Sequence, residues 1–241
     1  MAGHSKFKNI QHRKNAQDQK RAKLFTRLVR EIITAAKEGN SDPEFNPRLR
    51  MAISNAKTMN LPKERVDRAL QSAANPQLND NYDEMRYEGY ISDGVAVIVE
   101  ALTDNKNRTA GEVRKIFSKH GGKLGETGSV SFMFDYVGII KYQNIDKTEN
   151  EILEKALEFG AKDVEFNLDN VTIYTEKEDY SEVFEQIVRS LGSPEEAGIG
   201  WKPQTTIQIS NEDSIDKINS LIDALDENDD VQQVFTNLNV S

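Results

Sequence analysis

The spacing of apolar residues changes its character once along this chain, and that change is the strongest constraint on its fold. Up to about residue 75, apolar residues recur only at the three-to-four-residue interval of a helix. Beyond a polar stretch at 75–83, helical spacing alternates with segments in which every second residue is apolar, the pattern of strands. The sequence therefore predicts a helical N-terminal part followed by an α+β part.

The charge changes sign at nearly the same place. The first 70 residues contain 16 Lys and Arg against seven Asp and Glu, net +9, whereas the other 171 contain 15 against 33, net −18. A cationic segment releases condensed counterions from a phosphate backbone, while an acidic body is repelled by it. We therefore expect only the N-terminal part to contact nucleic acid.

Three helices are predicted in the N-terminal part. The first carries an apolar stripe over 24–36, and Gly39 is its predicted C-cap. Asn46 followed by Pro47 predicts the start of a second helix, and Leu61-Pro62 the start of a third. Together these helices predict a small bundle.

The cations of the first helix and of the segment before it form the candidate nucleic-acid site. At about 100° per residue, the cations of the helix lie opposite its apolar stripe. The segment upstream lacks apolar periodicity, so we expect an arm that is mobile when free and ordered when bound. A solvated face or an anionic membrane surface are the alternatives, but Asp18 is the one acid among nine Lys and Arg through Arg30. The predicted nucleic-acid-binding residues are Lys6, Lys8, His12, Arg13, Lys14, Lys20, Arg21, Lys23, Arg27 and Arg30.

The acidic part reads as strands interrupted by single helices, which is typical of split β-α-β sandwiches. Strands are predicted at 95–102, 130–134, 138–142, 164–166, 171–175, near Trp201, at 206–209 and at 231–235, and helices at 110–120, 149–159, 180–191 and 214–226. Thr109 and Glu112 predict a capping box for the first of these helices. Periodicity leaves open whether the body is two consecutive modules divided near residue 170 or one module, roughly 137–202, inserted in another.

No catalytic or metal-binding pattern stands out. Cysteine is absent, which excludes disulfides, thiolate zinc sites and Cys nucleophiles. The glycine-rich segment 121–128 follows a helix and leads into a strand, whereas a phosphate loop does the reverse. Phe132 and Phe134 are predicted to share one strand face in the core, and 104–108 to form a helix cap. We predict no enzyme, no cofactor and no metal; an enzyme that uses Asp104 or Arg108 is the remaining alternative.

The N-terminal residues Met1–Lys6 lack the apolar core of a secretory signal. The longest apolar runs, such as Val95–Val99, are too short to cross a bilayer. We therefore expect a cytoplasmic protein with no membrane contact and no small-molecule substrate.

At many fixed positions the chain strongly resembles the YebC/PmpR family. The matches are Met1–Lys6, Asn9-Ile10, His12–Lys14, Gln17-Asp18, Lys20-Arg21, Phe25-Thr26, Arg30–Ile32, Asp42-Pro43, Asn46–Arg50, Leu61–Lys63, Tyr87–Tyr90, Thr103–Asn105, Asn107–Thr109, Gly121-Gly122 and Gly128–Phe134. They are densest in 1–135 and thinner afterwards. Phe7 departs from the usual Trp, and Ile91–Asp93 from a commoner Gly/Pro-rich turn.

The resemblance implies three domains, with the third inserted in the second. They are a basic helical domain at 1–75, a linker at 76–86, a middle α+β domain at 87–136 and 203–241, and an inserted ferredoxin-like α+β domain at 137–202.

The resemblance also implies a function without known enzymatic activity. Family members are labelled probable transcriptional regulatory, DNA-binding proteins. Mitochondrial relatives are translational activators of cytochrome c oxidase subunit one, and bacterial members have been tied to ribosomes. We therefore expect a non-enzymatic, nucleic-acid-binding regulator of gene expression. Its target is DNA in the main interpretation and ribosomal RNA, for a translation factor, in the alternative.

Overall fold

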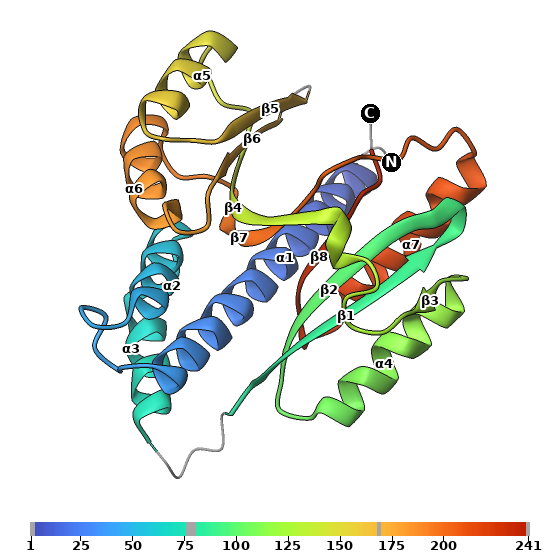
Figure 1. The fold of residues 1–241 in the computed structure, drawn as a ribbon, viewed down its shortest axis with the longest axis horizontal. Coiled ribbons are helices and arrows are strands. Elements are labelled where there is room, and N and C mark those ends of the chain that lie inside the picture. Colours follow the sequence, from blue (N-terminus) through green and yellow to red (C-terminus); the bar gives the residue numbers. More distant parts are fainter. Residues whose placement is uncertain (1–2, 76–80, 168–169, 240–241) are drawn as a thin grey trace. The chain divides into compact units, whose positions relative to one another are not determined.

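The computed structural model describes residues 3–75, 81–167 and 170–239, with side chains from Lys20 onward in the first of these ranges (Figure 1). The chain forms two compact units, Met1–Asp80 and Asn81–Ser241. The predicted α+β class is confirmed, with helices alone described in the first unit and two antiparallel sheets in the second.

The first unit consists of α1 (Gly3–Glu38), α2 (Pro47–Thr58) and α3 (Lys63–Ala74). The shorter helices α2 and α3 pack against the C-terminal half of α1 (Figure 1). The predicted stripe is buried there at Ile32, Ile33 and Ala36, but its earlier members Leu24, Phe25, Leu28 and Val29 are half-buried. Thr34 and Ala35 are buried as well, so α1 is enclosed on nearly all sides near its end.

Asn46 joins the end of α1 to the start of α2. Its Oδ1 accepts a hydrogen bond from the Leu49 N–H at 3.0 Å, which confirms the predicted N-cap. Its Nδ2 donates to the carbonyls of Ala35 and Asn40, both at 2.7 Å. Gly39 directly follows the last residue of α1, as predicted for its C-cap, but it has no positive φ. A Cβ at Gly39 would lie 2.6 Å from the Asn46 Nδ2, so glycine here permits a close approach.

The segment predicted as an N-terminal arm belongs to α1, which is helical from Gly3, and its mobility when free stays a prediction. Residues 4–23 contain no Pro or Gly, and they are rich in Lys, Arg, Gln and Ala, which favour helices. Once the packed part of α1 provides the nucleus, each further residue adds a hydrogen bond without a new nucleation cost. A search for apolar residues at helical spacing misses such a helix, because this segment has few apolar residues.

The first sheet of the second unit has strand order β3-β1-β2-β8, with all neighbours antiparallel. Its elements are β1 (Asp83–Ile91), β2 (Val95–Thr103), α4 (Lys106–Lys119), β3 (Lys123–Leu124), α7 (Glu212–Asp226) and β8 (Val231–Thr236). Helices α4 and α7 cover one face (Figure 1), where Val97, Val113 and Phe117 are fully buried with Ile218 and Leu221.

The second sheet has order β5-β6-β4-β7, again antiparallel throughout. Its elements are β4 (Phe134–Gln143), α5 (Glu149–Glu158), β5 (Asp163–Asn167), β6 (Asn170–Thr175), α6 (Tyr180–Leu191) and β7 (Glu196–Pro203). Because β6 lies between β4 and β5, the strands form a split β-α-β unit. Ile140, Ile173, Tyr180 and Ile187 are fully buried in its core.

The two sheets touch inside the second unit. The chain leaves the first sheet after β3, builds the second, and returns with β8 beside β2. Trp201 of β7 donates its Nε1–H to Glu100 of β2 at 2.8 Å, and the Arg86 guanidinium lies 5.1 Å from the Trp201 ring. A Cβ on Gly200 would lie 2.5 Å from Phe235, so β7 and β8 approach closely at this glycine.

Several predicted elements differ from the structure. The predicted strand at 130–134 is a 3-10 turn, η2 (Ser131–Met133), before β4. At 206–209 there is a single bridge, Ile207 to Leu238, and not a strand. Strand β1 was not predicted, and it begins inside the segment 76–86 predicted as a linker. A second 3-10 turn, η1 (Ser92–Gly94), connects β1 to β2.

The predicted capping box at Thr109 is wrong. Helix α4 starts at Lys106, and Asn105 caps it by accepting a hydrogen bond from the Arg108 N–H at 3.1 Å. The Thr109 hydroxyl is buried and donates to Asp230 at 2.7 Å. The sequence pattern suggested that Thr109 caps the helix, whereas its hydroxyl makes a long-range contact instead.

Candidate nucleic-acid interface

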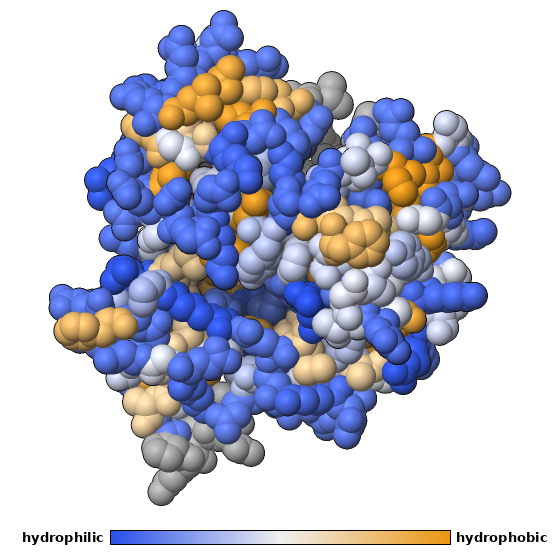
Figure 2. Space-filling view, in the orientation of Figure 1, coloured by the Kyte–Doolittle hydropathy of each residue, from blue (hydrophilic) through white to orange (hydrophobic). Residues whose placement is uncertain are grey.

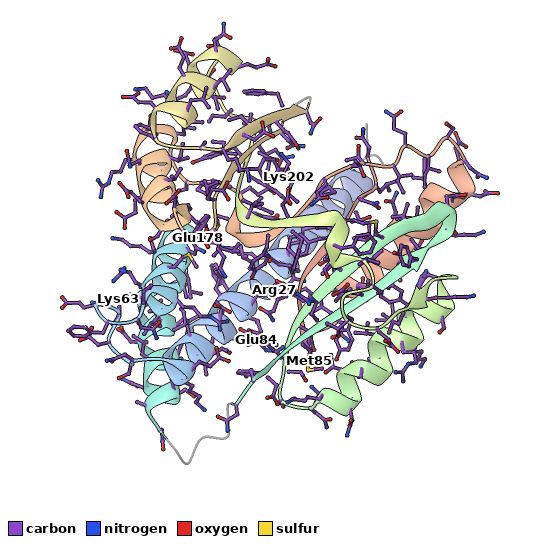
Figure 3. All side chains as sticks on the ribbon, viewed as in Figure 1. Arg27, Lys63, Glu84, Met85, Glu178 and Lys202 are labelled. Atoms are coloured by element: carbon purple, nitrogen blue, oxygen red, sulfur yellow. The ribbon has the colours of Figure 1, made fainter. Side chains whose placement is uncertain are left out.

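Five of the predicted nucleic-acid-binding residues have described side chains, and all five lie on α1. Lys20 and Arg21 are exposed, and Lys23, Arg27 and Arg30 are half-buried. Figure 3 labels Arg27 on this helix. Lys6, Lys8, His12, Arg13 and Lys14 lie on the helical backbone of α1, and their side chains are outside the described residues.

The acids in the C-terminal half of α1 are held by one arginine from α2. Arg48 Nε lies 2.8 Å from Glu31 Oε1 and its Nη2 lies 3.0 Å from Glu31 Oε2, a two-point contact. Its Nη1 also bonds to Glu38. Because Arg48 takes up both carboxylates, they oppose an approaching phosphate less than unpaired acids would.

Phe25 brings two cations together at the surface of the first unit. The Arg21 guanidinium lies 5.2 Å from the centroid of the Phe25 ring, and that of Arg65 lies 5.7 Å from it. Both distances are within cation–π range. Arg65 comes from α3, so this aromatic ring places an α3 cation beside one of α1. Sequence reasoning did not single out Arg65, because a contact between two helices has no local signal.

The segment 104–108, considered above for an enzyme, anchors α4 to the sheet. Arg108 Nη2 lies 2.7 Å from both Asp104 and the buried Asp230. Its hydrogen bonds to Asp230 and Asp104 hold the pKa of Arg108 above its ordinary value. Asp230 also accepts from the hydroxyls of Thr103 and Thr109. These contacts are those of a structural ion pair.

The remaining sequence candidates have structural roles or different positions. His120 is the C-cap of α4, and Gly121, at φ 78°, begins the turn into β3. Phe134 is buried as predicted, but Phe132 is 69% exposed on η2, so the prediction that both lie in the core is wrong for Phe132.

A pocket of about 310 Å³ lies on the open face of the second sheet. Lys202, labelled in Figure 3, pairs there with Asp163 and Glu165. Its Nζ lies 3.9 Å from the ring centroid of Tyr174, whose hydroxyl donates to Glu165. Burial alone would lower the pKa of Lys202, but these acids raise it above its ordinary value. The charged groups satisfy one another, so the pocket has the character of a surface ion cluster.

Within the described residues, no group of three or more His, Asp or Glu side chains is placed to hold a metal ion. None of the helices within the described ranges combines the length and apolarity that a bilayer span requires.

Comparison with known proteins supports the family resemblance over nearly the whole chain. One family model, described as the TACO1/YebC protein N-terminal domain, matches residues 5–76, and another, the TACO1/YebC second and third domain, matches 82–238. A probable transcriptional regulatory protein of Rickettsia bellii (strain OSU 85-389) is 56% identical over 100% of this chain and 94% of its own. One from Rickettsia rickettsii (strain Sheila Smith) is 53% identical over 100% and 96%.

A solved structure is similar as well. The crystal structure of a conserved hypothetical protein from Aquifex aeolicus superposes with a TM-score of 0.84 at 46% sequence identity, covering 92% of this chain and 91% of that one. With two family models that together cover nearly all its residues, this chain belongs to the TACO1/YebC family.

Proposed function

We propose that this protein is a non-enzymatic regulator of transcription that acts in the cytoplasm and binds DNA through the basic face of α1. Its relatives in Rickettsia bear the name of probable transcriptional regulatory proteins. The first unit supplies the cationic surface that such a role requires, and the second unit is strongly acidic.

The observation that carries the proposal is the arrangement of charge on α1. The helix has 36 residues, about 54 Å at 1.5 Å per residue, so cations at both ends of the predicted set share one rod. Glu31 and Glu38 are engaged by Arg48, while Arg65 adds a cation next to Arg21. Phosphate contacts of this kind position a protein on nucleic acid without reading sequence.

The absence of enzymatic activity is part of the proposal. Arg108 and Asp104, the residues considered for catalysis, hold α4 in place. Arg108 donates to an oxygen of the buried Asp230 that also accepts from two threonine hydroxyls, and this shared contact gives Arg108 a structural role.

A charge-reversal experiment tests the role of α1. Replacing Arg13, Lys14, Lys20 and Lys23 with Glu should abolish binding to duplex DNA while the helical circular dichroism is kept. Each lost contact should also flatten the dependence of log K on log salt by about 0.9. A control replaces Lys147, Lys177 and Lys217, three exposed cations of the second unit, with Glu. DNA binding that survives in the α1 variant would contradict the proposal.

Crosslinking in living cells, followed by sequencing of the attached nucleic acid, tests the level of regulation. Reads in discrete chromosomal segments would support transcriptional control. Reads concentrated in ribosomal RNA would refute it and favour the translation-factor alternative.

A further inference from the structure

The acidic second unit contains one strongly basic segment. Residues 81–241 hold 15 Lys and Arg against 32 Asp and Glu, net −17. Six of those cations and a single acid, Glu112, fall within 106–123, which leaves nine cations and 31 acids for the rest of the unit. The overall charge of the unit therefore hides a local field of the opposite sign.

Six of the nine other cations of this unit are neutralised by a neighbour. Those in ion pairs are Arg86, Lys141, Lys155, Lys162, Arg189 and Lys202. Within the basic segment, Lys106 and Arg108 are paired as well. Within the described residues, Arg114, Lys115, Lys119 and Lys123 have no acid within ion-pair distance, and all four are exposed. Four unneutralised cations in ten residues contrast with the pairing elsewhere.

The helix α4 directs three of these cations to one side. Val113 and Phe117, both 0% exposed, face the sheet. At 100° per residue, Lys115 and Lys119 point away from these two residues, and Arg114 lies on the flank of the helix, about 60° from Phe117. Gly111 lies on the same outer side, and a Cβ added to it would meet no atom within 4 Å. In Figure 2, the visible surface over α4 is mainly hydrophilic.

We propose that this outer face of α4, formed by Arg114, Lys115 and Lys119 and continued by Lys123, is a second contact with the phosphate backbone of duplex DNA. This rests on the proposed function, in which α1 makes the first contact. From Arg114 to Lys119 the helix rises about 7.5 Å, and duplex DNA carries one charge per about 1.7 Å of its axis. The face therefore lies opposite several phosphates at once, and small Gly111 lets the backbone approach.

An anionic membrane is a poorer occupant of this face. Surface helices bind membranes by inserting an apolar side beneath the headgroups. The apolar side of α4 is occupied by the sheet, because Val113 and Phe117 are fully buried. The exposed side offers charge alone, which suits a phosphate backbone.

Salt-dependent binding by the full chain tests the proposal. The test variant carries Arg114→Gln, Lys115→Gln and Lys119→Gln. The matched control carries Lys147→Gln, Lys177→Gln and Lys217→Gln, which removes the same charge from exposed positions of the same unit. Binding to one duplex is measured between 50 and 200 mM salt, with an α1 variant, Lys20→Gln with Arg21→Gln, alongside.

Three lost contacts should reduce the slope of log K against log salt by about 2.7. Over this fourfold range of salt, wild-type affinity should therefore fall about 40-fold more than that of the test variant. The control should keep the wild-type slope. The single Lys119→Gln variant, with an expected slope change of about 0.9, repeats the test with minimal risk to folding.

The outcomes separate the two proposals. If the α1 variant loses slope but the α4 variant matches the control, the inference is overturned and the proposed function stands. If the wild-type chain does not bind the duplex, both fail. A loss confined to single-stranded RNA or to vesicles of anionic lipid also overturns the assignment to DNA.

Discussion

Glu88 in β1 is a buried carboxylate that fixes the loop between β3 and β4. Its side chain is 0% exposed, and Oε2 accepts the N–H groups of Val130 and Ser131, both at 2.9 Å. Arg86 Nε lies 2.9 Å from Oε1, an ion pair whose atoms are not aligned as a hydrogen bond. Replacing Glu88 with Gln keeps the shape and removes the charge, so it isolates the electrostatic part of this anchor.

The expected loss can be worked out from these contacts. Hydrogen bonds to a charged acceptor contribute about 1.5–3 kcal/mol each, and neutral ones about half as much. The amide oxygen of Gln can still accept from Val130 and Ser131, but its NH₂ group then faces the Arg86 guanidinium. We expect Glu88→Gln to lower the free energy of unfolding by about 3 kcal/mol, which is about 6–12 °C in Tm for a unit of this size.

The same carboxylate predicts a dependence of stability on pH. Burial alone would raise the pKa of Glu88, but the N–H groups of Val130, Gly128 and Ser131 hold it below its ordinary value of 4.5. A lowered folded-state pKa contributes stability that is present above the unfolded pKa and is lost as pH falls through the folded value. The difference in stability between wild type and Glu88→Gln should therefore be largest near neutral pH and shrink below about pH 4.5.

Urea unfolding followed by the fluorescence of Trp201 gives the measurement. This chain has a single Trp, and the Arg86 guanidinium lies 5.1 Å from its ring, so its emission reports on the second unit. Glu126→Gln, at an exposed position of the same loop, is the control and should change stability by less than about 0.5 kcal/mol. Equal unfolding midpoints for Glu88→Gln and wild type at pH 7 would refute the reasoning.

Two further substitutions give opposite signs of stability change. Asp230→Ala removes the carboxylate that accepts from the Thr103 and Thr109 hydroxyls and pairs with Arg108, so thermal unfolding should show a loss of about 3 kcal/mol. The exposed neighbour, Asp229→Ala, is the control, and equal losses in the two variants would contradict this. Gly111→Ala fills open space inside α4 and should raise stability by about 0.5–1 kcal/mol, whereas a lower midpoint in calorimetry would show that the surface is not open.

Local signals predicted the parts of the fold whose contacts are local. The caps at Asn46 and the span Tyr180–Leu191 of α6 are confirmed, because capping residues and apolar periodicity act within one or two turns. The strand predicted at 130–134 is wrong for a long-range reason. The N–H groups of Val130 and Ser131, which a strand would use in its ladder, go to Glu88, 42 and 43 positions away.

The candidate site was predictable only as a set of charges. Charge density along the sequence indicates α1, but not that Arg48 would take up Glu31 and Glu38 or that Phe25 would bring Arg65 beside Arg21. The basic segment 106–123 was overlooked because the net charge of the acidic part concealed it. The domain limits 87–136 with 203–241, and 137–202 for the insertion, stay a prediction.

The charged residues of strand β1 made the strand hard to predict, and the same residues determine its role in the structure. Glu84, Arg86 and Glu88 alternate with Met85, Tyr87 and Gly89, a pattern of period two that was present in the sequence. The segment was predicted as a linker because its residues are mostly polar, whereas a strand beside a core is expected to have an apolar side chain at every second position.

In the structure the charged side of β1 faces the junction of the two sheets. There Arg86 lies between the buried Glu88 carboxylate and the Trp201 ring, and Trp201 donates to Glu100, the β2 residue paired with Arg86. Burying a charged group at such a junction costs free energy unless the group meets its partner. This arrangement therefore favours one register between the two sheets. An apolar junction of equal area would specify the register less tightly.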